Sequence, residues 1–153
     1  MEPFTPVFNI ATILSLHKME SSMTTLKRLL VVEDQPQEIR LAANAAQSIG
    51  IADVEGRTSN RGAREYLDAG LRGERELPDA IVLDLDLGYE SGYELLRYWH
   101  STPRLAAIPL IVWSILGDQQ EMCRLFKVTR FLGKWEGEEA FREALSTLTQ
   151  APG

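Results

Sequence analysis

The sequence predicts an α/β domain built on a parallel five-stranded sheet that has helices on both faces. The main observation is an alternation, repeated five times, of a short apolar run with a longer amphipathic stretch. Residues 29–32 (LLVV) are a continuous apolar run, as expected for a strand that is covered on both faces. Because short βα repeats are joined by right-handed crossovers, this alternation specifies a doubly wound parallel sheet.

Each predicted strand is followed by a helix whose apolar residues recur at helical spacing. Pro36 and Gly50 mark the ends of the first helix, while Asn60 caps the second helix and Gly70 stops it. The expected strands are residues 29–32, 52–59, 79–86, 108–115 and 130–135. The five expected helices are residues 36–50, 60–70, 91–101, 117–128 and 137–150.

The helical spacing also predicts which side chains face the sheet. From the first, third, fourth and fifth helices these are Ile39, Ala42, Ala43, Ala46, Ile49, Leu95, Leu96, Trp99, Met122, Leu125, Phe126, Phe141, Leu145 and Leu148. We expect Cys123 to be a packed helical thiol, and Trp99, Trp113 and Trp135 to be packing residues. Neither histidine has companions at metal-ligand spacing.

Composition narrows the class of protein. A length of 153 residues suits one domain with a full core, and the content of 44% hydrophobic and 25% charged residues is typical of globular proteins. The net charge of −6 opposes a nucleic-acid partner, which would require a basic face. A single cysteine excludes an internal disulfide and fits a reducing compartment.

The N-terminal segment is the unusual part of the chain. Its apolar run, residues 7–16, is too short to span a bilayer, and no basic residue precedes it as in a signal peptide, so no membrane partner is expected. Two interpretations remain open for residues 1–25, a short appended helix or a flexible tail translated from an upstream start, and we favour a dispensable tail. The domain is expected over residues 26–150, with residues 151–153 as a tail.

Polar and charged residues follow the predicted strands at their carboxyl ends, the edge where ligands bind in open α/β sheets. In the stretch IVLDLDLG, an acid ends a core strand, although burying an unpaired carboxylate costs several kcal/mol or more. We therefore expect partners for it at this edge. The strand-end residues are Glu33, Asp34, Asp84, Asp86, Ser114 and Lys134.

The charges of this set point to a chemistry. Glu33, Asp34 and Asp84 carry three negative charges, which Lys134 and one divalent cation would neutralise. Carboxylate oxygens with room for water suit Mg²⁺. A lysine, the Ser114 hydroxyl and Mg²⁺ around a carboxylate are the groups that a transferring phosphoryl group needs.

Over residues 26–149 the pattern resembles the receiver domain of bacterial two-component response regulators. The resemblance is carried by LLVVED, DAIVLDLDLGYESGYELLR, IPLIVWS and RFLGKW, which stand in the family's order and at its spacing. It implies a flavodoxin-like sheet of strand order 2-1-3-4-5, as in chemotaxis regulators, and a cytoplasmic protein.

The resemblance implies a role for each strand-end acid. Asp84 matches the phosphoacceptor, and Glu33 and Asp34 match the acid pair that binds Mg²⁺ or Mn²⁺ together with Asp84. Asp86 would lend its main-chain carbonyl to the metal. Its side chain, together with Leu116, would tune the lifetime of the phosphate.

Further positions match the family's switch. Ser114 matches the hydroxyl that reaches for the phosphoryl group, Lys134 the lysine that pairs with that group, and Phe131 the aromatic residue whose rotamer couples to the switch. Gly92 matches the glycine at the start of the third helix.

Two loops depart from the family pattern. Trp135 follows Lys134 where the family usually has proline, which favours a trans peptide bond and a reshaped loop. Leu87-Gly88 replaces the usual Met-Pro after the acceptor and makes that loop freer. We expect these changes to affect partner recognition more than chemistry.

The function that follows is that of a stand-alone response regulator. It would receive a phosphoryl group from a histidine kinase or a histidine phosphotransfer protein, and it would signal to a protein partner through the face formed by the fourth helix, the fifth strand and the fifth helix. Beyond its own phosphorylation and dephosphorylation no enzyme activity is expected, and homodimer formation stays open.

Two alternative interpretations remain open. An apolar strand ending in D-x-D also resembles the first motif of haloacid-dehalogenase-type phosphatases, with Asp84 as nucleophile and Asp86 as general acid. In that class the motif lies near the N-terminus and the second acid pair comes later, which is the reverse of this chain. The other rival is a receiver-like module that binds partners without being phosphorylated.

Overall fold

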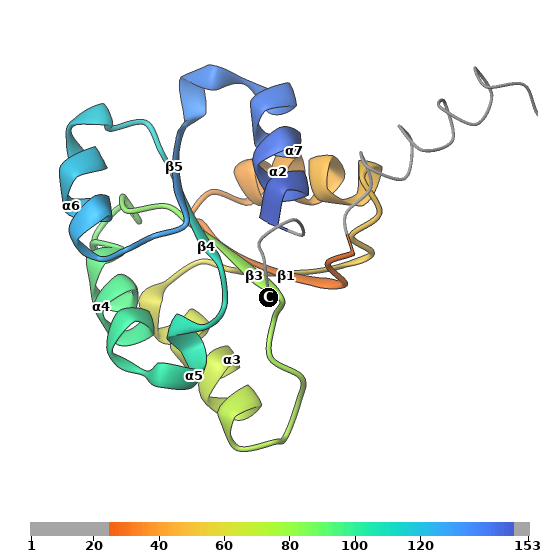
Figure 1. Cartoon of the computed structure of the whole chain (residues 1–153), viewed down its shortest axis with the longest axis vertical. Coiled ribbons are helices and arrows are strands. Elements are labelled where there is room, and N and C mark those ends of the chain that lie inside the picture. The colour runs from red at the N-terminus through yellow and green to blue at the C-terminus, as the bar shows by residue number, and fades with distance from the viewer. Residues whose placement is uncertain (1–24, 149–153) are drawn as a thin grey trace, which may run out of the picture.

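The structure is a computed structural model, and it describes residues 25–148. The expectations for residues 1–24 and 149–153 lie outside the described residues. The described part contains one parallel sheet of order β2-β1-β3-β4-β5, the predicted doubly wound arrangement. Figure 1 shows β1, β3, β4 and β5 in the middle of the molecule. Its strands are β1 (Arg28–Val32), β2 (Asp53–Arg57), β3 (Ala80–Leu83), β4 (Leu110–Ser114) and β5 (Arg130–Gly133).

The helices follow the prediction with three additions, one α-helical turn and two 3₁₀ turns. The α-helices are α2 (Pro36–Ser48), α3 (Asn60–Leu71), α4 (Tyr93–Ser101), α5 (Pro103–Ala106), α6 (Gln120–Leu125) and α7 (Glu138–Thr147). The single turn α5 was not expected; it starts at Pro103, whose fixed φ suits a first helical position, and it buries Leu105. Two 3₁₀ turns, η1 (Gly117–Gln119) and η2 (Lys134–Glu136), precede α6 and α7.

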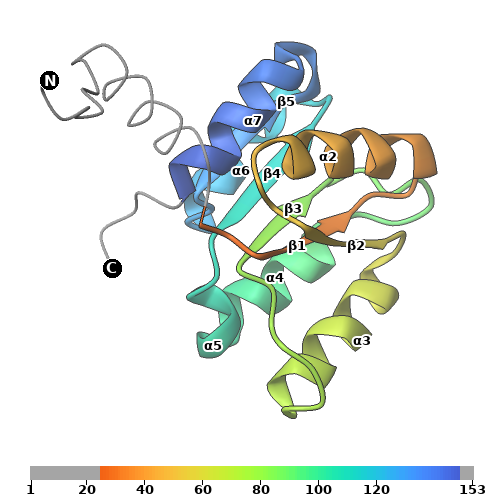
Figure 2. The same cartoon turned by 90° about the vertical axis from the view of Figure 1, so that its right-hand side faces the viewer.

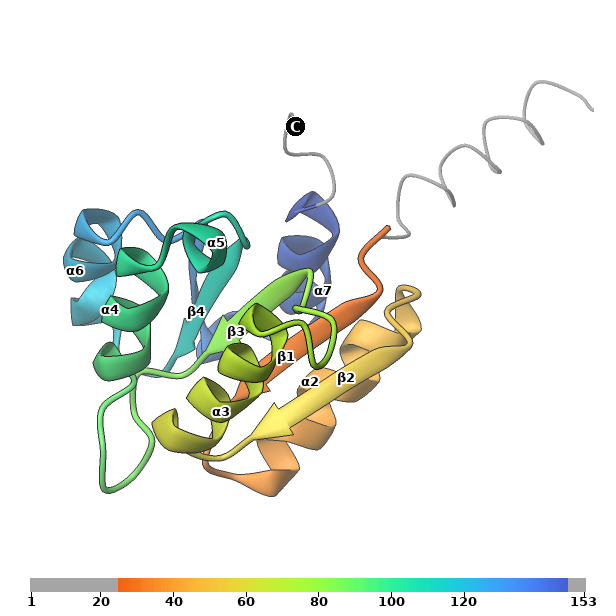
Figure 3. The ribbon, with the colours of Figure 1, turned by 90° about the horizontal axis from the view of Figure 1, so that it is seen from below.

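The helices cover both faces of the sheet. Figure 2 shows α2 and α7 on one side and α3, α4 and α5 on the other, and Figure 3 shows α6 beside α4. Successive residues of a strand face opposite sides, so Leu29 and Val31 pack with α2 and α7, while Leu30 and Val32 pack with α3 to α6. This double cover explains why β1 is a continuous apolar run.

The predicted inward faces of α4 and α7 are confirmed, since all their named residues are buried. The prediction for the fourth helix was wrong in part, because Met122 and Leu125 are exposed. This helix has only six residues, and Cys123 packs on the core together with Phe126 three residues later. In α2 the fully buried alanines include Ala45, while Ala43 is half-buried.

The predicted caps of the second helix were wrong. Ser59 is the N-cap of α3, because its hydroxyl accepts a hydrogen bond from the backbone N–H of Gly62 at 3.0 Å. Asn60 is the first helical residue, and its side chain leaves the helix to contact α4. The helix also continues past Gly70 to Leu71, and the chain turns at Gly73, where φ is +78°. Among residues 25–148 no helix has the length and apolar character needed to cross a membrane.

Candidate functional site

The register of the sheet brings the acids of β1 and β3 together. Val32 lies opposite Leu83, so Glu33 and Asp84 leave neighbouring strands at the same edge. The backbone N–H of Asp84 still donates to the carbonyl of Val32, at 3.0 Å. Glu33 and Asp84 are only 1% and 4% exposed, so two carboxylates are buried side by side.

Lys134 bridges these two carboxylates. It follows β5 directly, and its Nζ lies 2.6 Å from Oε2 of Glu33 and 2.9 Å from Oδ2 of Asp84. The same ammonium group lies 4.8 Å from the centroid of the Trp113 ring, a cation–π distance. The structure therefore joins the ends of β1, β3 and β5 through one lysine, as the sequence predicted; the contact with Trp113 was not foreseen.

The loop after β3 donates a hydrogen bond to the other carboxylate oxygen of Asp84. Oδ1 accepts a hydrogen bond from the backbone N–H of Asp86 at 2.9 Å. The chain then returns so closely that a Cβ atom at Gly92 would lie 2.3 Å from the carbonyl oxygen of Asp84. This close approach explains why glycine stands before α4. The carboxylate of Asp84 thus accepts one hydrogen bond on each oxygen, from the N–H of Asp86 on Oδ1 and from Lys134 on Oδ2.

The three acids form a candidate cation site. Glu33, Asp34 and Asp84 each offer a carboxylate oxygen, and these oxygens lie within 4.8 Å of one another. With Lys134 as the bridging cation, the group keeps a formal charge of −2 when fully ionised. A pocket of about 120 Å³, lined in part by Asp34, Asp84, Asp86 and Lys134, leaves room for an ion with water. Such oxygen ligands fit Mg²⁺ or Mn²⁺.

Electrostatics favour a further cation at this place. Loss of solvation is the largest influence on Glu33 and raises the pKa of its carboxyl to about 8, although the hydrogen bond from Lys134 opposes it. For Lys134, burial by itself would lower the pKa of the ammonium group, but the hydrogen bonds to Glu33 and Asp84 outweigh it and raise the pKa. The lysine is thus held charged while the acids remain short of positive charge.

The side chain of Asp86 lies apart from the three clustered acids. It is exposed, and its Oδ1 accepts a hydrogen bond from the backbone N–H of Gly88 at 3.2 Å. Gly88 has φ +78°, a conformation that glycine adopts without strain. The local turn therefore ties the side chain of Asp86 to its own loop, while its backbone N–H faces Asp84.

The predicted switch residues lie on β4 and β5. Ser114 ends β4 and is buried, and its hydroxyl accepts from the backbone N–H of Leu116 at 3.1 Å and donates to Oε1 of Gln119 at 3.3 Å. In the described structure this hydroxyl is engaged within its own loop. Phe131 is half-buried in β5, and its ring centroid lies 6.4 Å from that of Trp135. The bond to Gln119 could not be read from the sequence, because no motif marks that residue.

Trp135 corrects one expectation. Trp99 and Trp113 are buried as predicted, but Trp135 is 63% exposed. The turn η2 lays its ring over the backbone of Gly133, where an added Cβ would come within 2.3 Å of the ring. The peptide bond between Lys134 and Trp135 is trans, as expected in place of the family's proline, and so are the other peptide bonds of the described residues.

Comparison with known proteins adds one curated relative. No family model matches the sequence. The chain is 29% identical over 99 residues to the "Probable methanogenesis regulatory protein FilR2" of Methanothrix harundinacea. The match covers 64% of this chain and spans 64% of the length of that relative.

Solved structures give a fuller match. The phosphorylated cyanobacterial phytochrome response regulator RcpA superposes with a TM-score of 0.68 at 25% identity, over 82% of this chain and 94% of that one. The Mn²⁺-bound form of the response regulator Rcp1 gives 0.68 at 22% identity, over 83% and 97%. The strand order, the acids at the ends of β1 and β3 and these similarities together give the chain the fold of response regulator receiver domains, to which it is similar.

Proposed function

We propose that this receiver accepts a phosphoryl group on Asp84 from the phosphohistidine of a histidine kinase or a histidine phosphotransfer protein. The observation that carries the proposal is the surroundings of Asp84: a buried carboxylate at a strand end, with Lys134 2.9 Å from one oxygen and two further acids beside it. A purely structural carboxylate would need one partner, not an acid cluster. The phosphorylated state of RcpA, a similar chain, supports the same reaction here.

The transfer is a displacement at phosphorus. One carboxylate oxygen of Asp84 forms a bond to phosphorus while the bond between phosphorus and the donor's imidazole nitrogen breaks. The electron pair of the broken bond stays on that nitrogen, which takes up a proton. The product is an aspartyl phosphate, and Lys134, already 2.9 Å from Asp84, offers its ammonium group to the new negative charge.

The acid cluster serves this reaction by holding a divalent cation. Glu33, Asp34 and Asp84, together with the main-chain carbonyl of Asp86, would hold Mg²⁺ or Mn²⁺, in keeping with the donor set described above. When bound, such an ion offsets the charge of the phosphoryl oxygens. Asp86 and Leu116, both exposed beside the site, tune how long the phosphate persists.

We expect phosphorylation to change the conformation of residues on β4 and β5. In this proposal the hydroxyl of Ser114 leaves Leu116 and Gln119 for the phosphoryl group, and Phe131 repacks behind it. This shifts the population between two packings of the face formed by α6, β5 and α7, and so changes its affinity for a downstream protein.

The decisive experiment is incubation with acetyl phosphate and Mg²⁺, followed by intact-mass measurement. We expect one phosphoryl adduct on the wild type and none on Asp84→Asn, which keeps the shape of the side chain but is not a nucleophile. The absence of an adduct on the wild type, or an equal adduct on Asp84→Asn, would refute the proposal.

A second variant separates the two aspartates of the loop. Asp86→Asn should still form the adduct, but with an altered lifetime, because residue 86 lines the pocket and its backbone is unchanged. Loss of phosphorylation as complete as in Asp84→Asn would show that Asp86 has been misassigned. Turnover of p-nitrophenyl phosphate would instead favour the phosphatase interpretation.

A further inference from the structure

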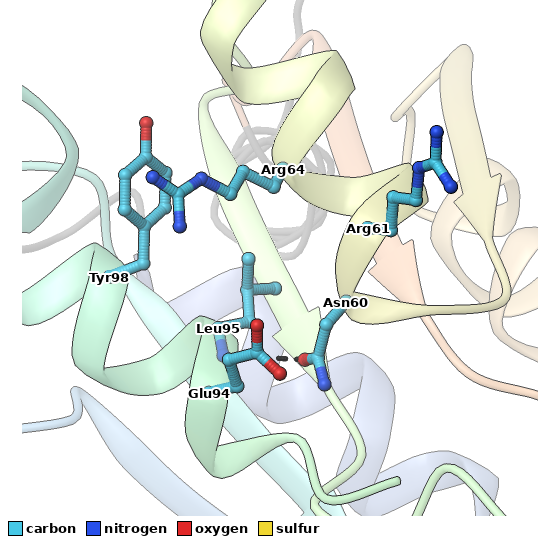
Figure 4. A pocket seen from close by; sticks show the side chains of 6 residues that line it. All are labelled: Asn60, Arg61, Arg64, Glu94, Leu95 and Tyr98. Carbon is cyan, nitrogen blue, oxygen red and sulfur yellow. Dashed lines mark hydrogen bonds between the residues drawn. The ribbon is translucent and has the colours of Figure 1, made fainter. Parts of the chain in front are cut away.

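The start of α3 and the start of α4 are joined by an exchange of hydrogen bonds through Asn60. This residue is 4% exposed, and Figure 4 shows its side chain pointing from α3 toward the first turn of α4. Its Oδ1 accepts from the backbone N–H of Leu95 at 3.3 Å, and its Nδ2 donates to the carbonyl of Ser91 at 2.8 Å. In the other direction, the backbone N–H of Asn60 donates to Oε1 of Glu90 at 2.7 Å.

These bonds satisfy donors that helices leave free. The first four backbone N–H groups of a helix have no partner within it. The N-cap of α4 is Gly92, which has no side chain, so Asn60 supplies an acceptor from another helix. Ser59 caps Gly62 within α3 but leaves the N–H of Asn60 to Glu90. A residue of α3 therefore caps α4, and a residue of the loop before α4 caps α3.

The same bonds fasten the loop that carries Asp86. Ser91, whose carbonyl is held by Asn60, pairs with Asp86 in an antiparallel bridge. Glu90 accepts from the backbone N–H of Leu87 at 3.0 Å through its carbonyl. The loop is thus closed on itself and tied to α3 on its far side, and at its near side the N–H of Asp86 donates to Oδ1 of Asp84.

We propose that Asn60 and Glu90 are positioning residues for phosphoryl transfer, which hold the main chain of Asp86 against the carboxylate of Asp84. The inference rests on the proposed function of Asp84. One oxygen of this carboxylate takes the N–H of Asp86 and the other takes Lys134, so the carboxylate cannot rotate freely. Displacement of a reacting group by about 1 Å can cost on the order of 100-fold in rate.

The two arginines near Asn60 do not take part in its hydrogen bonds with the loop and α4. Figure 4 shows Arg61 directed away from α4 and Arg64 lying over the ring of Tyr98. The guanidinium carbon of Arg64 is 4.1 Å from the centroid of that ring, and its Nε is 3.8 Å from Asp68. The two cations beside Asn60 are therefore engaged elsewhere, Arg61 with Glu65 and Arg64 with Tyr98.

The test compares Asn60→Ala with Ser59→Ala. Each removes one helix-capping side chain, Ser59→Ala at the start of α3 and Asn60→Ala at the start of α4, so we expect similar decreases in the urea midpoint of unfolding. With acetyl phosphate and Mg²⁺, the adduct should form about tenfold or more slowly on Asn60→Ala and within about twofold of the wild-type rate on Ser59→Ala. Glu90→Ala, at an exposed position, should also slow the formation of the adduct.

A second readout does not depend on phosphorylation. Amide hydrogen exchange at Asp86 should become faster in Asn60→Ala and Glu90→Ala, and should stay unchanged in Ser59→Ala. Wild-type rates of adduct formation in both variants, or unchanged exchange at Asp86, would overturn the inference. A wild type that forms no adduct would instead overturn the proposed function. The exchange data would still decide whether Asn60 and Glu90 hold the main chain of Asp86 in place.

Discussion

The acid cluster (Glu33, Asp34 and Asp84 with Lys134) and the switch segment (residues 114–119) lie at the same edge of the sheet but are held in different ways. In the cluster, buried carboxylates leave two central strands and share one lysine through ion pairs of 2.6 and 2.9 Å. In the switch segment, Ile115 is 60% exposed, and the chain continues into a single 3₁₀ turn and a six-residue helix.

This difference suits the acid cluster to the proposed phosphoryl transfer and the switch segment to the conformational response. Buried ion pairs are costly to break one partner at a time, so the acceptor and its lysine have one strongly preferred arrangement. Short elements with exposed apolar side chains have few contacts to lose, and such regions open locally at low cost. The domain thus keeps its reacting groups preorganised, while the segment beside them is able to repack.

Loss of the lysine should have the largest effect. Lys134→Met keeps the aliphatic stem but leaves three acids without their bridging cation, and it should cost about 3 kcal/mol of unfolding free energy at pH 8 in chelator. Urea denaturation measures this loss, and the rate of adduct formation should also fall strongly, since a cation on the transferring group is removed.

Lys27→Met is the matched control, because Lys27 is exposed next to the amino end of β1, at the opposite edge of the sheet. It should leave both quantities unchanged. Equal losses in the two variants would show that the cluster is not held by its lysine.

The metal-free protein should lose stability as the pH rises. Burial raises the pKa of Glu33 from its ordinary 4.5 to about 8, so between these values the folded state binds this proton more tightly than the unfolded state does. The free energy of unfolding therefore decreases from about pH 4.5 to about pH 8. In EDTA the apparent Tm should fall over this range, by about 2–4 °C for each kcal/mol lost.

Glu33→Gln should flatten this profile, and Mg²⁺ should raise the Tm of the wild type at pH 8. A wild-type Tm that is constant or rises through this range would contradict the raised pKa of the buried Glu33.

Removing the switch hydroxyl should have a smaller effect on chemistry. Ser114→Ala deletes hydrogen bonds with Leu116 and Gln119 and should cost about 1 kcal/mol in unfolding free energy. The phosphoryl adduct should still form at a rate within a few-fold of wild type, because the acid cluster is intact. Because the ring of Phe131 lies beside that of Trp135 and repacks in the proposed switch, phosphorylation should change Trp135 fluorescence, and Ser114→Ala should lose this change.

Ser114→Thr keeps the hydroxyl and should retain that fluorescence change. If Ser114→Ala blocked adduct formation as strongly as Lys134→Met, the division between a reacting cluster and a responding segment would be wrong.

The smallest effect on stability is expected at Trp135. Its ring is mostly exposed, so Trp135→Phe should change the unfolding free energy by no more than about 0.5 kcal/mol. The response of tryptophan fluorescence to Mg²⁺ should remain in this variant and vanish in Trp113→Phe, because the ring of Trp113 contacts Lys134.

Trp99→Phe is the control for this experiment, since its indole N–H donates to the carbonyl of Ile108 in the core beneath α4. If the fluorescence response to Mg²⁺ were lost in Trp135→Phe and kept in Trp113→Phe, the cation would act on the turn η2 and not on the acid cluster.

The sequence by itself determined which residues meet at the sheet edge. Apolar runs followed by amphipathic helices specify a parallel sheet, and the carboxyl ends of parallel strands lie together whatever the loops do. Glu33, Asp84, Ser114 and Lys134 could therefore be predicted as neighbours from position alone. The inward faces of α4 and α7 followed from helical spacing in the same way.

Only the tertiary structure decided which partner satisfies each group. Nothing in the local pattern of Asn60 shows that it caps α4 instead of its own helix, because the choice depends on packing with residues 31 and 35 positions away. The exposure of Trp135 and the narrow inward face of α6 likewise depend on how short turns meet the end of the sheet. Periodicity and strand ends are local properties of a chain, whereas hydrogen-bond partners and burial are set by contacts between distant segments.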